Sequence, residues 1–502
     1  MLAVVGGVVW TARGWPVLAG QSSARGAAAS PIAQPWLKPV PRAECGTADR
    51  LETGLQGQTT IAERMSGASA KAFNCNLELV GQFQGEGANY QMAAFDHCAY
   101  YGTSVREGLR SKGVVVIDAA NPRRPVAATY LDARPMWDPW ESLKVNVSRK
   151  LLAAVQADNG SGEQPGFAVY DISSCARPVL KSSVNLNSPV KGHAGNFAPD
   201  GRTYYGTHIG AGTYAIDIDN PATPTLLGLW PGQNGMGLPH DLSLNAGGDR
   251  LYTAQPGGLN RPGEPQRQNG LVISDTSDFQ ARKQGDPKVI GSLFWKDGAV
   301  AQMTERVQIG GRPYLIFTDE AGAGGIADGA KTACAQNLPP YGFARIIDIA
   351  DEKNPRIVSQ LMLDVHDPKH CSTVQLDTGF TDLFGYSSHY CTADDASNAE
   401  YLACSYFEAG VRVFDIRDPY RPKEIAYYKP PARSAMLPGS SNSSIRRHGN
   451  RTADWASSNV HWHREGDELH LWFTSHENGF QIVRFTNRLT SLALKFKGIT
   501  RQ

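Results

Sequence analysis

Short runs of alternating apolar and polar residues recur along this chain of 502 residues. Two clear copies are GVVVIDAANPRRPVAATYL from Gly113 and GVRVFDIRDPYRPKEIAYY from Gly410. Each copy begins with Gly, alternates with period two, reaches an Asp, and passes through an Asn/Asp-Pro turn into a second apolar run. This pattern predicts two β-strands joined by a tight turn.

The same pattern occurs seven times, and the last copy, GFQIVRF, stops after one strand. The copies begin at Gly113, Gly166, Gly212, Gly270, Gly342, Gly410 and Gly479. A second pair of apolar runs precedes each copy, as in HAGNFAPDGRTYYGTH from His193, and is typical of a hairpin. Two hairpins per repeat give the four strands of a propeller blade. We therefore predict an all-β fold, a seven-bladed β-propeller with four-stranded antiparallel blades.

The incomplete last copy needs one more strand. Residues 76–84, NLELVGQFQ, are similar to the outer strands of other repeats, such as PTLLGLW and PKVIGSLF. We expect this N-terminal segment to complete the last blade and remove an open edge from the ring. The alternative is that residues 488–498 supply the strand.

The repeat pattern resembles that of LVIVD-repeat β-propellers. The resemblance implies the propeller fold and an exported or cell-surface setting, and it names no single reaction. Within it we divide the chain into a signal-like segment over 1–30, an N-terminal extension or linker over 31–74, and a propeller over 75–498. The start, MLAVVGGVVW, is apolar like a signal peptide, and a disordered apolar tail is the alternative.

The eight cysteines are even in number and form no CxxC pair. In a secreted, periplasmic or cell-surface protein they are expected to form disulfides. The sequence leaves their pairing open, although Cys391 and Cys404 are placed to bridge an inserted loop.

Histidines and glutamates occupy corresponding positions in the repeats. The first hairpin opens with His193, His240, His461, Glu141 or Glu305, and fifteen residues later come His208, Gln255, His476, Gln156 and Glu320, respectively. His370 and His389 take these places in the sixth repeat, and His97 opens the first. The innermost strand of a blade starts at the face to which the second strand returns. We therefore expect two rings of these side chains around one mouth of the axial channel.

Imidazoles and carboxylates that converge on one point suit a transition metal such as copper, zinc or iron. The predicted metal ligands are His97, Glu141, His193, His208, His240, Glu305, Glu320, His370, His389, His461 and His476. The competing interpretation is that these side chains only brace neighbouring blades through hydrogen bonds. No nucleotide cofactor is expected, because GEGANY at 85–90 is too short and badly placed for a phosphate loop.

Three functions follow from this reading. The first is a metal-dependent exported protein that acts on a small molecule; selenium-binding-type methanethiol oxidases, propellers that bind metal through His, are similar at the level of the fold. The second is a non-catalytic surface or scaffold protein that binds a protein or glycan through its loops. The third, a lactonase-like hydrolase with calcium, is disfavoured because calcium prefers oxygen ligands. A net charge of +1 without a basic cluster argues against nucleic-acid binding, and no later segment is apolar enough to span a bilayer.

Overall fold

The structure is a computed structural model of the chain. It describes residues 38–103, 113–157, 166–186, 192–208, 212–230, 239–257, 268–283, 285, 287–325, 329–377, 384–433, 437 and 453–491. The predicted signal-like segment at 1–30 lies outside these residues. In the part that is described, no helix is long and apolar enough to cross a membrane.

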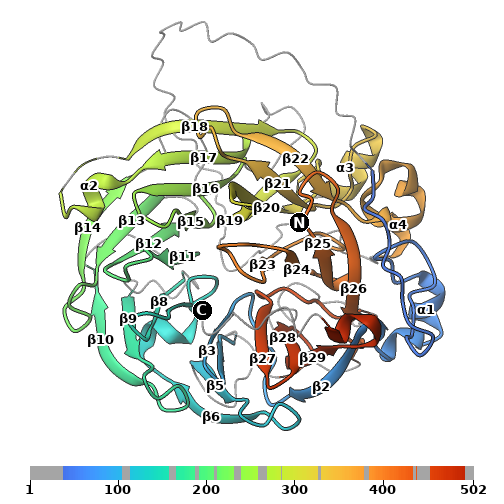
Figure 1. The fold of residues 1–502 in the computed structure, drawn as a ribbon, viewed down its shortest axis with the longest axis horizontal. Helices are drawn as coiled ribbons and strands as arrows, with labels where there is room; N and C mark the ends of the chain where they lie inside the picture. Colours follow the sequence, from blue (N-terminus) through green and yellow to red (C-terminus); the bar gives the residue numbers. More distant parts are fainter. Residues whose placement is uncertain are drawn as a thin grey trace, which may run out of the picture.

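Seven antiparallel sheets surround a common axis, which confirms the predicted seven-bladed propeller (Figure 1). Blade 1 comprises β3 (Met92–Phe95), β4 (Cys98–Tyr101), β5 (Val114–Asp118) and β6 (Val126–Leu131). Blade 2 comprises β7 (Lys144–Asn146), β8 (Leu151–Val155), β9 (Gly166–Asp171) and β10 (Val179–Asn185). Blade 3 comprises β11 (Gly195–Phe197), β12 (Thr203–His208), β13 (Gly212–Asp217) and β14 (Thr225–Trp230). Blades 4 and 5 comprise β15 (Leu242–Leu244), β16 (Arg250–Pro256), β17 (Asn269–Asp275) and β18 (Lys288–Trp295); and β19 (Ala299–Ile309), β20 (Arg312–Ala321), β21 (Ala344–Asp348) and β22 (Arg356–Leu361). Blades 6 and 7 comprise β23 (Cys391–Ala393), β24 (Tyr401–Tyr406), β25 (Gly410–Asp415) and β26 (Lys423–Lys429); and β27 (His461–Glu465), β28 (Glu468–Ser475), β29 (Gly479–Phe485) and β2 (Leu77–Phe83).

The helices are short and lie between the strands or at the rim of the ring. They are α1 (Ile61–Met65), η1 (Ala68–Ala70), η2 (Arg134–Trp137), α2 (Ser277–Gln280), α3 (Gly329–Ala335), η3 (Asp364–His366), η4 (Pro368–His370), α4 (Cys371–Asp377) and η5 (Asn487–Ser491). Figure 1 places α1, α3 and α4 at the rim of the ring.

The N-terminal strand closes the ring as predicted. β2 pairs antiparallel with β29, from Leu77 opposite Phe485 to Phe83 opposite Phe480, so one blade joins the two ends of the propeller (Figure 1). In the alternative segment, residues 487–491 form η5, and 492–498 lie outside the described residues. The closing strand next to β29 is therefore β2.

Blade 6 carries a fifth strand at its outer edge in addition to the four predicted. The additional strand is β1 (Phe73–Cys75), which pairs with β26 from Phe73 opposite Lys429. The preceding extension is tied to the same blade. There the buried guanidinium of Arg412 lies 2.7 Å from Glu52 and 2.9 Å from Glu424.

The Asp that ends each repeated strand is structural. In six repeats its carboxylate accepts a hydrogen bond from the backbone N–H two residues later, as Asp118 does from Ala120 at 2.9 Å and Asp348 from Ala350 at 3.0 Å. This bond stabilises the turn into the outer strand. The others are Asp171, Asp217, Asp275 and Asp415.

All eight cysteines form disulfides: Cys45–Cys75, Cys98–Cys175, Cys334–Cys371 and Cys391–Cys404. The predicted Cys391–Cys404 bridge is confirmed, and it joins facing residues of β23 and β24. Cys98–Cys175 connects blade 1 to the turn after β9 of blade 2.

Candidate functional site

Three histidines occupy equivalent positions just before the inner strands of blades 3, 4 and 6. The backbone N–H groups of His193, His240 and His389 each donate to a carbonyl of the second strand, at 2.9, 2.8 and 2.8 Å. Glu141, before the inner strand of blade 2, donates its backbone N–H to the carbonyl of His193 at 3.1 Å. The start of the inner strand therefore fixes the backbones of four side chains beside the axis.

Neighbouring blades orient two of these imidazoles. Nδ1 of His240 lies 3.1 Å from the carbonyl oxygen of Gln302, and Nδ1 of His389 lies 2.5 Å from that of Ser457. A carbonyl oxygen can only accept, so Nδ1 carries the proton in both rings. In the neutral imidazole the lone pair is then on Nε2, as in a metal-binding histidine.

The Nε2 atoms meet each other and two buried carboxylates. Nε2 of His193 lies 2.9 Å from Nε2 of His240 and 3.2 Å from Oε2 of Glu141. Nε2 of His389 lies 3.0 Å from Oε1 of Glu141 and 3.5 Å from Oε2 of Glu320. Oε1 of Glu320 lies 3.6 Å from Nε2 of His240. Five of the eleven predicted ligands thus form one cluster, which we call the axial cluster: Glu141, His193, His240, Glu320 and His389.

Gln302 belongs to the axial cluster and was not predicted. Its amide nitrogen lies 3.0 Å from Oε1 of Glu141 and 2.9 Å from Nε2 of His389, so it donates to both. Gln302 is fully buried, and its Oε1 has no hydrogen-bond partner. The amide oxygen of Gln302 is therefore available within the axial cluster as a hydrogen-bond acceptor or a metal ligand.

Burial and mutual charge set the protonation of the axial cluster. Burial, together with the neighbouring His193, lowers the pKa of His240 to about 3, so this ring is neutral at neutral pH. Burial and the carboxylate of Glu141 raise the pKa of Glu320 well above its usual range. Burial also acts to raise the pKa of Glu141, but His240, His193 and His389 hold it well below its usual range. The two carboxyl groups therefore have opposite protonation preferences.

Aromatic rings pack beside the axial cluster. The ring of Tyr90 lies 4.7 Å from that of Trp140, 5.5 Å from that of His389 and 5.0 Å from that of His476. The side chain of His193 is 21% exposed, whereas those of Glu141 and His389 are 2% and 0% exposed. Solvent therefore reaches the cluster over His193.

The structure places several predicted ligands away from the axial cluster. Glu305 is inside β19, and its carboxylate accepts a hydrogen bond from the backbone N–H of Ala393 at 3.0 Å. His461 begins β27 and packs against Trp472, with ring centroids 5.5 Å apart. His370 ends η4, in the insertion before β23. These three lie outside the axial cluster, and their role as ligands stays a prediction.

The physical reason is that the position of the inner strand varies between blades. In blade 7, Ser457 lies beside the axial cluster, four residues before His461, and its carbonyl accepts the Nδ1 hydrogen bond of His389. In blade 5, Gln302 lies in the axial cluster, three residues before Glu305, at a bulge between Ala301 and Met303. A fixed fifteen-residue offset does not detect such shifts.

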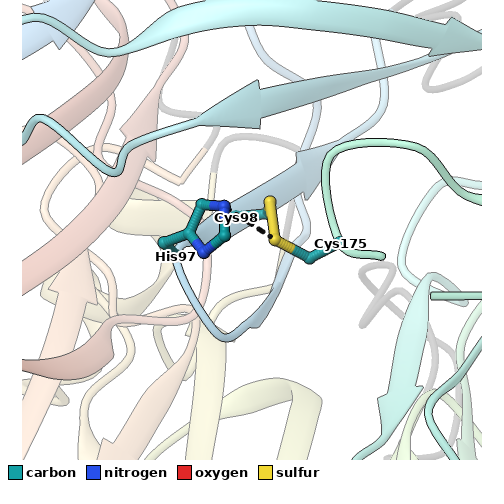
Figure 2. Close-up of side chains that lie close together, drawn as sticks. All are labelled: His97, Cys98 and Cys175. Carbon is teal, nitrogen blue, oxygen red and sulfur yellow. Dashed lines mark hydrogen bonds between the residues drawn. A yellow bond between two sulfur atoms is a disulfide. The ribbon is translucent and has the colours of Figure 1, made fainter. Parts of the chain in front are cut away.

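His97 lies at the turn between β3 and β4, so the prediction that it opens the inner strand is wrong. Its Nε2 is 3.4 Å from Sγ of Cys175, beside the Cys98–Cys175 disulfide (Figure 2). Both sulfurs are bonded to each other, so neither is a thiolate ligand. Just before β3 of blade 1, the amide of Gln91 donates to the carbonyl of Glu141 at 3.3 Å.

The two remaining predicted ligands occupy the ends of second strands. His476 packs beside Tyr90 and Trp455, with its ring centroid 5.5 Å from that of Trp455. His208 is the last residue of β12. Their role as ligands stays a prediction.

Comparison with known proteins leaves function open. No family model and no curated protein matches the chain, so the LVIVD resemblance stays a prediction. Among solved structures, a putative 6-phosphogluconolactonase from Bacteroides fragilis NCTC 9343 is similar, with a TM-score of 0.46 and 10% sequence identity. The match covers 78% of this chain and 93% of that chain.

Proposed function

We propose that this protein is an exported propeller that binds a transition-metal ion in the axial cluster and acts there on a small molecule. Copper, zinc and iron are the candidate metals. The ligands nearest to one another are Glu141, His193 and His240, whose donor atoms all lie within 4.8 Å of one another.

One observation carries the proposal: three imidazole nitrogens and the oxygens of two buried carboxylates converge at short range beside the axis. Nε2 of His240 has no proton when Nδ1 donates to Gln302, yet it lies 2.9 Å from Nε2 of His193 and 3.6 Å from a carboxylate oxygen of Glu320. A proton on Nε2 of His193 satisfies only one of these contacts, whereas a metal ion between the groups satisfies several at once. Metal–ligand bonds of about 2.0–2.1 Å give a tetrahedral edge of about 3.3 Å, close to these separations.

The donor set supports a transition metal over calcium. The three imidazoles are borderline donors that suit zinc, copper and iron, and carboxylates complete many sites for these ions, whereas calcium is bound by oxygen ligands alone. When bound, such an ion polarises a substrate oxygen, activates water or exchanges electrons. The rings of Tyr90 and Trp140 beside the axial cluster, and solvent access over His193 alone among its histidines, favour a small molecule over a polypeptide as the reacting partner.

The cysteines support export. All eight are paired, as is common in secreted, periplasmic and cell-surface proteins and rare in reducing compartments. A secreted, periplasmic or cell-surface location is therefore part of the proposal.

The test is the metal content of tag-free protein produced in an oxidising compartment. We expect at least one equivalent of copper, zinc or iron per chain by mass spectrometry, and its loss in Glu141→Gln and His240→Ala. Glu305→Gln is the matched control, because Glu305 is a half-buried glutamate of blade 5 outside the axial cluster. Protein without metal, with a melting temperature unchanged by a chelator, would refute the proposal and favour the bracing or scaffold interpretation.

A further inference from the structure

Glu141 faces two groups of ligands with its two oxygens. Oε2 lies 3.2 Å from Nε2 of His193 and 3.7 Å from Nδ1 of His240. Oε1 lies 3.0 Å from Nε2 of His389 and 3.0 Å from the amide nitrogen of Gln302. The carboxylate therefore lies between a blade 3–4 pair and a blade 5–6 pair of side chains.

Glu320 repeats this arrangement. Its Oε1 is 3.6 Å from Nε2 of His240, and its Oε2 is 3.5 Å from Nε2 of His389. Each carboxylate thus directs one oxygen to each histidine group, as carboxylates that bridge two metal ions do.

A single ion does not account for all five side chains. Ligands of one ion with bonds of about 2.1 Å lie at most about 4.2 Å apart. The donor atoms of Glu141, His193 and His240 all lie within 4.8 Å of one another, and His389 does not join this group. His389 is nevertheless 3.0 Å from the opposite oxygen of Glu141.

We propose that the axial cluster is a dinuclear site, in which Glu141 and Glu320 bridge one ion held by His193 and His240 and a second ion held by His389. The proposal rests on the proposed function, because it assumes that the axial cluster binds metal. Two-metal sites have ions about 3.5–4 Å apart, a separation that bridging carboxylates span.

Gln302 completes the second half of the site. Its fully buried amide donates to Glu141 and His389, while its Oε1 has no hydrogen-bond partner. Rotation of the amide group by half a turn exchanges the nitrogen and oxygen, which brings Oε1 to the position next to His389. The amide oxygen then becomes a ligand for the second ion.

The test is a zinc titration of metal-free, full-length protein, followed by calorimetry and by metal analysis after desalting. We expect two equivalents for the unaltered protein and for Glu305→Gln. In His389→Ala and in the nearly isosteric Glu320→Gln, we expect the first equivalent to remain and the second to bind at least about 10-fold more weakly. Circular dichroism establishes that each variant is folded.

A spectroscopic readout supplements the stoichiometry. With two equivalents of Cu²⁺, bridged ions couple magnetically, so the electron paramagnetic resonance signal should account for less than half of the bound copper. In Glu320→Gln one copper should give its full signal.

The outcomes separate this inference from the proposed function. One equivalent in the unaltered protein, with uncoupled copper, overturns the dinuclear site and leaves the metal-binding proposal standing. Two equivalents that persist unchanged in both His389→Ala and Glu320→Gln also overturn it. No bound zinc at all contradicts both proposals.

Discussion

His366 shows how a structural histidine differs from those of the axial cluster. Its Nδ1 accepts a hydrogen bond from the backbone N–H of Leu363 at 2.8 Å, and its Nε2 lies 3.0 Å from the carbonyl oxygen of Tyr386. Both ring nitrogens therefore have backbone partners, and the ring must be neutral to accept from Leu363. His240 and His389 have only Nδ1 anchored in this way and direct Nε2 to the axis.

The neutral His366 predicts a loss of stability in acid. Burial lowers the pKa of His366 to about 4, with Arg412 and Asp364 as its nearby charges. The unfolded state takes up a proton near pH 6.5, whereas the folded state does not until about pH 4. The stabilisation is therefore complete above pH 6.5 and is lost as the pH falls towards 4, by about 3 kcal/mol.

Urea unfolding at pH 7.5 and pH 4.5 measures this effect when the protein is compared with His366→Gln. The free energy of unfolding should fall more in the unaltered protein than in the variant, which has no group that titrates at this position. An equal fall in both would contradict the assignment.

The sequence predicted the chemistry of the axial cluster but not its full membership. Glu141, His193 and His240 could be found because each stands just before an inner strand of ordinary length. Gln302 could not be found, because it lies at a bulge between Ala301 and Met303, three residues before the position that the fifteen-residue offset selects. A glutamine also does not stand out as a metal ligand by residue type. His97 was selected by type although it lies in the turn after β3, whereas His461 begins β27 but packs against Trp472.

Outer strands contact the next blade through glycine. A Cβ added at Gly291 in β18 would lie 2.0 Å from the carbonyl oxygen of Glu352, and one at Gly81 in β2 would lie 2.2 Å from that of Pro122. At both glycines the pairing of the outer strand shifts in register, and the turn of the neighbouring blade packs at that point. The glycine is required for this close approach between blades.

Gly291→Ala should therefore destabilise the protein by about 1–3 kcal/mol, because the opposing atom is backbone and cannot move without shifting the turn. Gly329→Ala is the control, since its Cβ would meet its nearest atom at 3.6 Å, an ordinary contact, at the start of α3. Thermal unfolding should show a lower midpoint for the first variant only. Equal midpoints would show that the two blades accommodate the added methyl group without a loss of stability.

The closing strand β2 could be predicted from the sequence, whereas the additional strand β1 of blade 6 could not. Residues 77–83 share the apolar pattern of the other outer strands, so their role in blade 7 followed from the repeat. β1 has only three residues, Phe73–Cys75, too few for a period to be recognised. Its pairing depends on the extension held by Arg412 and Glu52.

Across the whole molecule, disulfides join parts that the repeats leave independent. Cys98–Cys175 links blade 1 to blade 2 over a sequence separation of 77, whereas Cys391–Cys404 lies within blade 6 over a separation of 13. Longer loops restrict the unfolded chain more. The inter-blade bridge should therefore contribute more to stability.

Replacement of both cysteines by Ala should cost about 4 kcal/mol for the pair 98 and 175, and about 3 kcal/mol for the pair 391 and 404. Both pairs are buried, so the cavities they leave are comparable. The difference in urea midpoint between the two double variants measures the ordering. A reversed order would show that local packing outweighs loop closure.

The seven-bladed ring itself followed from the repeats, because each copy encodes its own strands and turns. The convergence of ligands at the axis is a property of the closed ring, so the sequence predicted it only in outline.

The most direct test of metal binding is a crystal structure of protein purified without chelator, measured at the absorption edges of copper, zinc and iron. We predict an anomalous peak about 2.0–2.2 Å from Nε2 of His193 and His240 and from a carboxylate oxygen of Glu141. A site without any anomalous peak, with His193 and His240 joined by a direct hydrogen bond, would contradict this prediction.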